Sequence, residues 1–180
     1  PGMLGSATES TSEKVFAALG VAPEWARGST GDIIDSVKDN RIIGYVKSGA
    51  GDRLDSSSID ISTTTPTDII GLSDDEIATI RETFPNLSIV EITENAAGDG
   101  YPAYRTWAFG TGAVAHPDMD EETVYRIVKA VVEDNTFQAA AFAGVKGSDF
   151  PRLTMEMATT PLHPGALRYY REIGIDIPDH

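Results

Sequence analysis

Small, hydroxyl-bearing residues near the start of the chain have the pattern of an anion-binding helix start. Gly5, Ser6, Ala7 and Thr8 lead directly into a helical pattern. The first N–H groups of a helix have no intrahelical partners, and the helix dipole favours negative charge beside them. Residues 5–8, called the N-terminal loop below, therefore predict a binding site for a carboxylate or a phosphate. The hydroxyl groups of Ser6, Thr8 and Ser10 add hydrogen-bond donors.

The same stretch also fits an ordinary capped helix that binds no ligand. Ser6 with Glu9, and Ser10 with Glu13, have the spacing of a capping box, in which the first side chain binds a backbone N–H group and the second reaches back. From these residues alone, both interpretations stay open.

Tyr101 is a second candidate for ligand contact. Tyr101-Pro102 follows the turn signal Gly98-Asp99-Gly100, which comes after an expected strand. This position would let the ring lie over a ligand. The alternative is a tyrosine on the surface with no such role.

The sequence predicts no metal, no cofactor and no nucleophile. The chain has no cysteine, and His116, His163 and His180 lack the partners at zinc-binding spacing. No G-x-S-x-G motif is present, and neither a phosphate-binding P-loop nor a dinucleotide-binding glycine motif occurs.

Composition and charge narrow the class of protein further. The 180 residues are 41% apolar, which suits one large domain or parts of two. The net charge of −14 argues against nucleic acid or an anionic membrane as the main partner. No apolar run approaches the roughly 20 residues that span a bilayer.

Hydrophobic periodicity predicts alternating helices and strands. Helices are expected at 10–19, 32–38, 55–62, 73–84, 118–134, 137–143 and 164–173. Strands are expected at 42–46, 67–72, 87–92 and 106–115, whereas 148–161 has no regular pattern. This order predicts a parallel α/β layer. A strand should precede the N-terminal loop in such a layer, and none does.

Several stretches resemble the TAXI-type solute-binding proteins of TRAP transporters. Residues 5–9 are similar to the family's Gly-Ser-Gly-Thr-Glu segment, and 161–174 closely resemble its C-terminal signature. Further similarity lies at 64–70, at Tyr101-Pro102 and at 120–133, so the resemblance covers essentially the whole chain.

The resemblance implies an α/β fold of the type II periplasmic-binding-protein kind. The lobe would have a parallel or mixed sheet flanked by helices, as part of a two-lobed clamshell. Residues 1–104 would form most of the second lobe, and 105–180 the returning strand and the C-terminal helices. The first lobe, the signal sequence and the missing strand would lie upstream of Pro1.

The resemblance also implies an extracytoplasmic binding protein without enzymatic activity. It would capture a small carboxylate ligand, such as an organic acid or glutamate, and deliver it to TRAP permease subunits. The N–H groups of Ser6, Ala7 and Thr8, with the hydroxyls of Ser6 and Thr8, would hold the carboxylate beside Gly5. Tyr101 would cover it. Ala7 stands where the family usually has Gly, which makes a positive φ harder to adopt there.

Two other functions fit the same features. The first is a ligand-sensing domain of a signalling system, which a neighbouring permease gene would argue against. The second is an enzyme that acts on small phosphorylated substrates through the same anion site. No acid–base pair lies beside the N-terminal loop in the sequence, which weakens the enzyme hypothesis.

Overall fold

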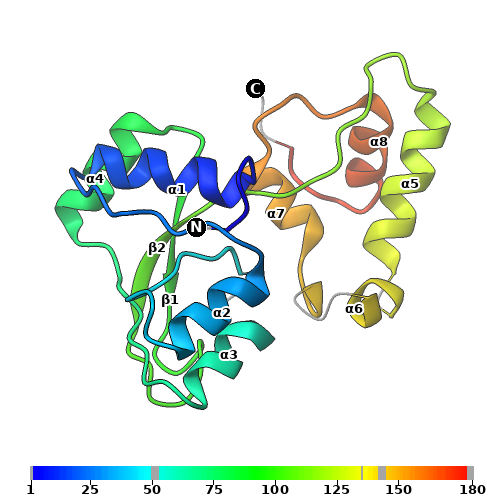
Figure 1. Ribbon diagram of the computed structural model, residues 1–180. Coiled ribbons are helices and arrows are strands. Elements are labelled where there is room, and N and C mark those ends of the chain that lie inside the picture. The colour runs from blue at the N-terminus through cyan, green and yellow to red at the C-terminus, as the bar shows by residue number, and fades with distance from the viewer. Residues whose placement is uncertain (1, 50–52, 135, 142–144, 178–180) are drawn as a thin grey trace. The chain divides into compact units, whose positions relative to one another are not determined.

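The chain divides into two compact units, which are described here separately (Figure 1). The computed structural model describes residues 2–49, 53–134, 136–141 and 145–177. The first unit is Pro1–Ala108 and the second is Phe109–His180. Within the described residues, no helix has both the length and the apolar character needed to cross a bilayer.

Four described helices and one pair of strands build the first unit. The helices are α1 (Ala7–Ala18), α2 (Thr30–Lys38), α3 (Ser56–Ser62) and α4 (Asp74–Thr83). The strands are β1 (Ser88–Ile92) and β2 (Tyr104–Ala108). All four helices were expected from the sequence, with ends that differ by a few residues.

The helices of the first unit begin at side chains that bind their free N–H groups. Ser29 and Ser73 form complete capping boxes with Asp32 and Glu76. α1 packs on α4, and α2 packs on α3. The two most buried apolar side chains of α1 and α4 are Val15 and Ile80, each with no exposed surface.

The sheet differs from the expected parallel layer. β1 and β2 form an antiparallel pair, in which Ile89 lies opposite Trp107 and Glu91 opposite Arg105. The described residues contain no parallel pair of strands. The expected strand at 42–46 is wrong, because these residues form an irregular segment in which Ile43 is fully exposed. An apolar run becomes a strand only where another strand offers its backbone groups.

The expected strand at 67–72 is also wrong, although its last residues lie beside β2. The Leu72 N–H group donates to the Arg105 carbonyl oxygen at 2.9 Å, and the Arg105 side chain donates to the Leu72 carbonyl oxygen at 3.2 Å. The segment has no strand geometry, and Ile70 is 92% exposed. Of the other expected strands, 87–92 is confirmed as β1. The strand expected at 106–115 is shorter and lies earlier, as β2.

The second unit consists of helices in its described residues. They are α5 (Glu121–Glu133), α6 (Phe137–Ala141), α7 (Phe150–Met157) and α8 (Pro164–Glu172). α7 was not predicted, although Asp149 as N-cap and Pro151 in the first turn are helix-start signals. Residues 142 and 143 of the expected helix at 137–143 lie outside the described residues.

α5 and α8 form the core of the second unit. Val124 of α5 and Ala166, Tyr169 and Tyr170 of α8 are buried together. Val124, Ile127, Val128, Val131 and Val132 form an apolar stripe along α5 that is only partly buried, because Ile127 is 49% exposed and Val131 is 39% exposed. The half of the stripe that includes Val128 and Val132 packs against the core.

Gly165 permits the close approach of these two helices. A β-carbon placed there would lie 2.4 Å from the Glu121 carbonyl oxygen and 2.7 Å from the Tyr125 amide nitrogen. These are backbone atoms, which cannot move aside as a flexible side chain can.

Substitution Gly165→Ala should therefore destabilise the second unit. We expect a loss of about 1–3 kcal/mol in the free energy of unfolding, the usual range for overpacking. Urea unfolding followed by far-UV circular dichroism measures it. Gly112→Ala is the matched control, because no atom lies within 4 Å of a β-carbon there. Equal stability of the two variants would contradict the close packing of α5 on α8.

Candidate functional site

The N-terminal loop closes the start of α1 with backbone and side-chain hydrogen bonds. Gly5 has a φ of +80°, a conformation that favours glycine. Ser6 is the N-cap residue, and its hydroxyl accepts from the Glu9 N–H group at 3.2 Å. The Ser6 N–H group donates to the Met3 carbonyl oxygen at 3.1 Å, so it does not face a ligand as expected.

Two amides of the loop stay available for an anion. Within the described residues, neither the Ala7 nor the Thr8 N–H group has a hydrogen-bond acceptor, as the geometry of a first helical turn requires. Ala7 is exposed and belongs to the helix, so it needs no positive φ. Its difference from the glycine of the TAXI-type segment therefore introduces no backbone strain.

The carboxylate of Glu9 already occupies part of the loop. Its Oε2 atom accepts from the Gly5 N–H group at 2.6 Å, and the residue is only 5% exposed. This differs from the predicted capping box, in which the Glu9 side chain would bind the Ser6 N–H group. The second predicted box is wrong as well, because Ser10 lies inside α1.

Arg27 neutralises Glu9 from outside the loop. Its Nε atom donates to Glu9 Oε1 at 2.6 Å, and its guanidinium group also pairs with Glu13. The hydrogen bond from Arg27, followed by that from the Gly5 amide, lowers the pKa of Glu9 below its ordinary value. Glu9 is therefore a carboxylate at neutral pH, and Arg27 is its counter-ion.

A second segment reaches the start of α1 through Ser48. The hydroxyl groups of Thr8 and Ser48 form a hydrogen bond of 2.7 Å. The neighbouring Lys47 binds the Asp55 carboxylate and the Ser57 hydroxyl at the start of α3. This ion pair attaches the segment that carries Ser48 to α3.

Tyr101 lies in the same unit but does not contact the loop. Its hydroxyl forms a hydrogen bond of 2.9 Å with Thr67, and its ring is half-buried. Among the described residues, no hydrogen bond, ion pair or ring contact joins Tyr101 to residues 5–8. Gly5, Ser6, Ala7 and Thr8 thus lie together, and no bond among the described residues attaches Tyr101 to them.

Two residues that contact the start of α1 could not be predicted from the sequence. Arg27 is 18 positions from its partner Glu9, and no local pattern links them. Ser48 lies 40 positions from Thr8, in the glycine-rich segment that follows the wrongly predicted strand. Both contacts depend on the tertiary fold.

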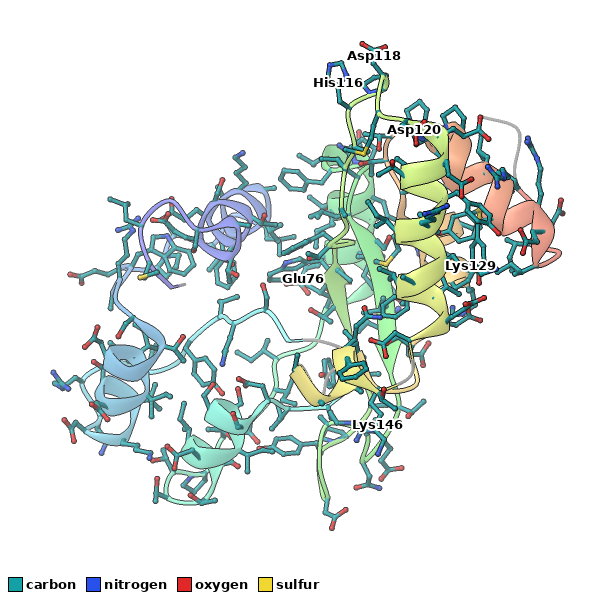
Figure 2. The ribbon with its side chains drawn as sticks, turned by 90° about the vertical axis from the view of Figure 1, so that its right-hand side faces the viewer. Glu76, His116, Asp118, Asp120, Lys129 and Lys146 are labelled. Carbon is teal, nitrogen blue, oxygen red and sulfur yellow. The ribbon has the colours of Figure 1, made fainter. Side chains whose placement is uncertain are left out.

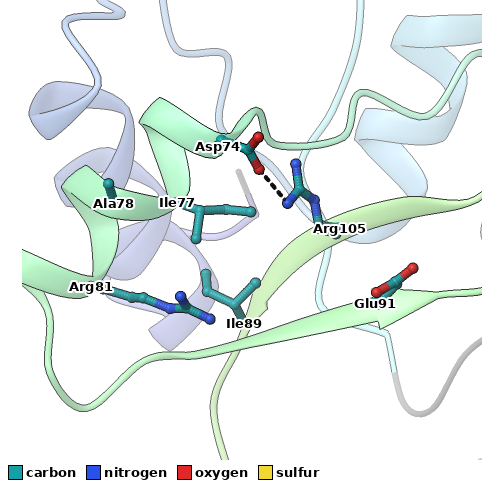
Figure 3. Close-up of a pocket in the computed structure, with 7 residues that line it drawn as sticks. All are labelled: Asp74, Ile77, Ala78, Arg81, Ile89, Glu91 and Arg105. Atoms are coloured by element: carbon teal, nitrogen blue, oxygen red, sulfur yellow. Dashed lines mark hydrogen bonds and ion pairs between the residues drawn. The ribbon is translucent and has the colours of Figure 1, made fainter.

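A separate hollow lies on the face of the sheet beneath α4, away from the predicted site residues. Its volume is about 420 Å³, and it is open to solvent. Figure 3 shows Arg105 paired with Asp74 at 2.6 Å, above the apolar side chains of Ile77 and Ile89. The lining residues are Asp74, Ile77, Ala78, Arg81, Ile89, Glu91 and Arg105. None of them belongs to the N-terminal loop.

No metal site is present in the part of the chain that the structure describes. Figure 2 shows His116 and Asp118 on the segment that leads to Asp120, the N-cap residue of α5. The Asp118 N–H group donates to His116 Nδ1 at 3.3 Å, which makes this a local turn. No group of three or more His, Asp or Glu residues converges there or elsewhere among the described residues.

The Lys47–Asp55 pair predicts a dependence of stability on pH. Burial alone would raise the pKa of Asp55, but hydrogen bonds from Lys47, Ser58 and Ser57 outweigh it and hold the pKa well below its ordinary value. The unfolded chain then binds more protons than the folded one. Asp55 thus makes its full contribution to the free energy of unfolding above its unfolded pKa of about 3.9. This contribution is lost as the pH falls further.

Substitution Asp55→Asn tests this dependence. We expect a loss of about 1 kcal/mol in the free energy of unfolding at pH 7, which disappears in acid. Urea unfolding followed by fluorescence reports it, because Trp25 and Trp107 both lie in the first unit. Asp68→Asn, which removes an exposed acid of the same unit, is the control. A loss that is constant between pH 7 and pH 3 would contradict the role of the carboxylate.

Comparison with known proteins identifies the family of the chain. No curated protein matches the sequence. Residues 1–174, nearly the whole chain, match the NMT1-like family. That family is of the periplasmic solute-binding type, which agrees with the expected class of fold and with a small-molecule ligand. The chain therefore belongs to the NMT1-like family of periplasmic solute-binding-type proteins.

Proposed function

We propose that this chain is part of the extracytoplasmic solute-binding subunit of a TRAP-type transporter. It captures a small carboxylate, an organic acid or an amino acid such as glutamate, when two lobes close on it. The loaded protein then delivers the ligand to the membrane permease. The family match over residues 1–174 carries this proposal. The resemblance of residues 5–9 and 161–174 to TAXI-type proteins supports the choice of transporter.

In this proposal, residues 1–104 supply most of the second ligand-binding lobe. Residues 105–180 supply the returning strand and the helices that pack on the hinge and the first lobe. Closure by a hinge motion would enclose the ligand between the lobes. No chemical step is needed, since capture and release use the same contacts.

The N-terminal loop is the proposed contact for the ligand carboxylate. The Ala7 and Thr8 N–H groups have no acceptor within the described residues, so a carboxylate placed there would complete the first turn of α1. The Ser6 hydroxyl accepts from Glu9 and retains its own O–H group for donation. Gly5 shapes the loop, and Tyr101 is the proposed cover of the bound ligand.

A panel of small anions tests ligand capture. We expect succinate or L-glutamate to raise the melting temperature of the protein in a thermal-shift assay. A ligand present at 100 times its Kd adds about 2.7 kcal/mol to the free energy of unfolding. Succinamide, which has the shape of succinate without its charge, is the control. If no anion of the panel raises the melting temperature, the carboxylate-binding hypothesis is wrong.

Substitution Ala7→Pro tests the place of binding. Proline is tolerated at the first position of a helix, where it removes the N–H group, and it restricts the residue before it to extended backbone. Ser6 already has φ −73° and ψ 152°, so the variant should fold as the wild type does. We expect about tenfold weaker binding of the anion found in the panel, because one hydrogen bond to a charged group is lost.

Thr30→Pro is the matched control for this substitution. Thr30 is the first residue of α2, and its N-cap residue Ser29 has φ −63° and ψ 164°. Anion affinity should not change in this variant when it is measured by calorimetry. Equal affinity of Ala7→Pro and the wild type would place the site away from α1.

A further inference from the structure

Glu9 is a buried carboxylate at the point where an anionic ligand would bind. It lies in the first turn of α1, one residue after the free amide of Thr8. Two like charges this close repel each other, and burial strengthens the repulsion because little water screens it. An unpaired Glu9 would therefore oppose binding of the carboxylate that the helix start attracts.

Arg27 removes this conflict through a geometry that holds both oxygen atoms of Glu9. Oε1 accepts from Arg27 Nε at 2.6 Å, and Oε2 accepts from the Gly5 amide at 2.6 Å. The segment that carries Arg27 is also attached through its backbone, since the Gly28 N–H group donates to the Gly2 carbonyl oxygen at 3.4 Å. The Arg27 side chain is 38% exposed, whereas the Glu9 side chain is 7% exposed.

We propose that Arg27 is a positioning residue for anion capture, which keeps Glu9 on Gly5 and offsets its charge, while the same guanidinium group also pairs with Glu13. The amides of Ala7 and Thr8 then face an incoming carboxylate while both oxygen atoms of Glu9 are bound, one to Arg27 and one to Gly5. Arg27 itself does not contact the ligand. This inference rests on the proposed function, because it concerns the same helix start.

Substitution Arg27→Met removes the counter-ion while retaining much of the side-chain length. We expect binding of succinate and L-glutamate, measured by isothermal titration calorimetry, to weaken about tenfold or more. Adding Glu9→Gln should restore most of the affinity. The amide oxygen that Glu9→Gln introduces can still accept from Gly5, and the charge nearest the ligand is gone, which leaves only Glu13 one turn further along α1.

Two further variants separate this role from general damage to the fold. Lys38→Gln removes a positive charge and a surface ion pair with Asp60 elsewhere in the unit, and it should bind like the wild type. Arg27→Lys keeps the charge, so it should retain most of the affinity, and it remains the charged comparison if Arg27→Met does not fold. In that case Arg27→Gln supplies the neutral side chain for the same comparison.

The outcomes distinguish this inference from the proposed function. If the wild type binds neither anion, the proposed function is wrong and the inference is wrong with it. If the wild type binds and removal of the Arg27 charge changes nothing, only the inference is wrong. If the single variant and the double variant with Glu9→Gln are equally weak, Arg27 has a structural role only, which also overturns the inference.

Discussion

The short helices of this chain depend on acceptors for the backbone N–H groups of their first turns. A helix of 7 to 13 residues, such as α3 or α5, is marginal alone, so the groups at its start contribute a large share of its stability. Side chains meet part of this need, with N-cap residues at Ser6, Ser29, Asp55, Ser73, Asp120 and Asp149. α1 is capped in the same way as α2 and α4: Ser6 binds the Glu9 N–H group, and the Ala7 and Thr8 amides before it have no acceptor among the described residues. Its position in the segment that resembles the TAXI-type proteins, and not a difference in capping, leads us to propose a ligand there.

The helix start that we propose as an anion site belongs to an acidic protein, so the negative charges around it must be offset. The net charge of −14 makes the surroundings of most sites unfavourable for a carboxylate. Arg27 offsets part of this charge locally, since its single positive charge is shared by the carboxylates of Glu9 and Glu13. Glu9 also holds Gly5 in its left-handed conformation, because its carboxylate accepts a hydrogen bond from the Gly5 N–H group. Charge and backbone geometry therefore both depend on Glu9.

Local signals predicted the helices well and the sheet poorly, for a physical reason. The serine caps at Ser6 and Ser73 and the apolar spacing of α5 are encoded within a few residues. A strand also needs a partner from another part of the chain, and the apolar run at 42–46 has none among the described residues. The candidate site likewise combines local features with contacts between distant segments. The hydroxyl and amide groups of residues 5–8 were visible in the sequence, whereas Arg27 and Ser48 come from distant segments that only the fold brings near.

The antiparallel pair of the first unit also bears on how copies of this protein behave at high concentration. Arg105 accepts the Leu72 N–H group on the outer side of β2, so its partner Glu91 directs its own backbone groups away from β2. That side of β1 has no neighbouring strand within the described residues. Open edges of this kind recruit strands from other molecules and start aggregation. The exposed charge of Glu91, the fourth of the five residues of β1, is the feature that discourages such pairing.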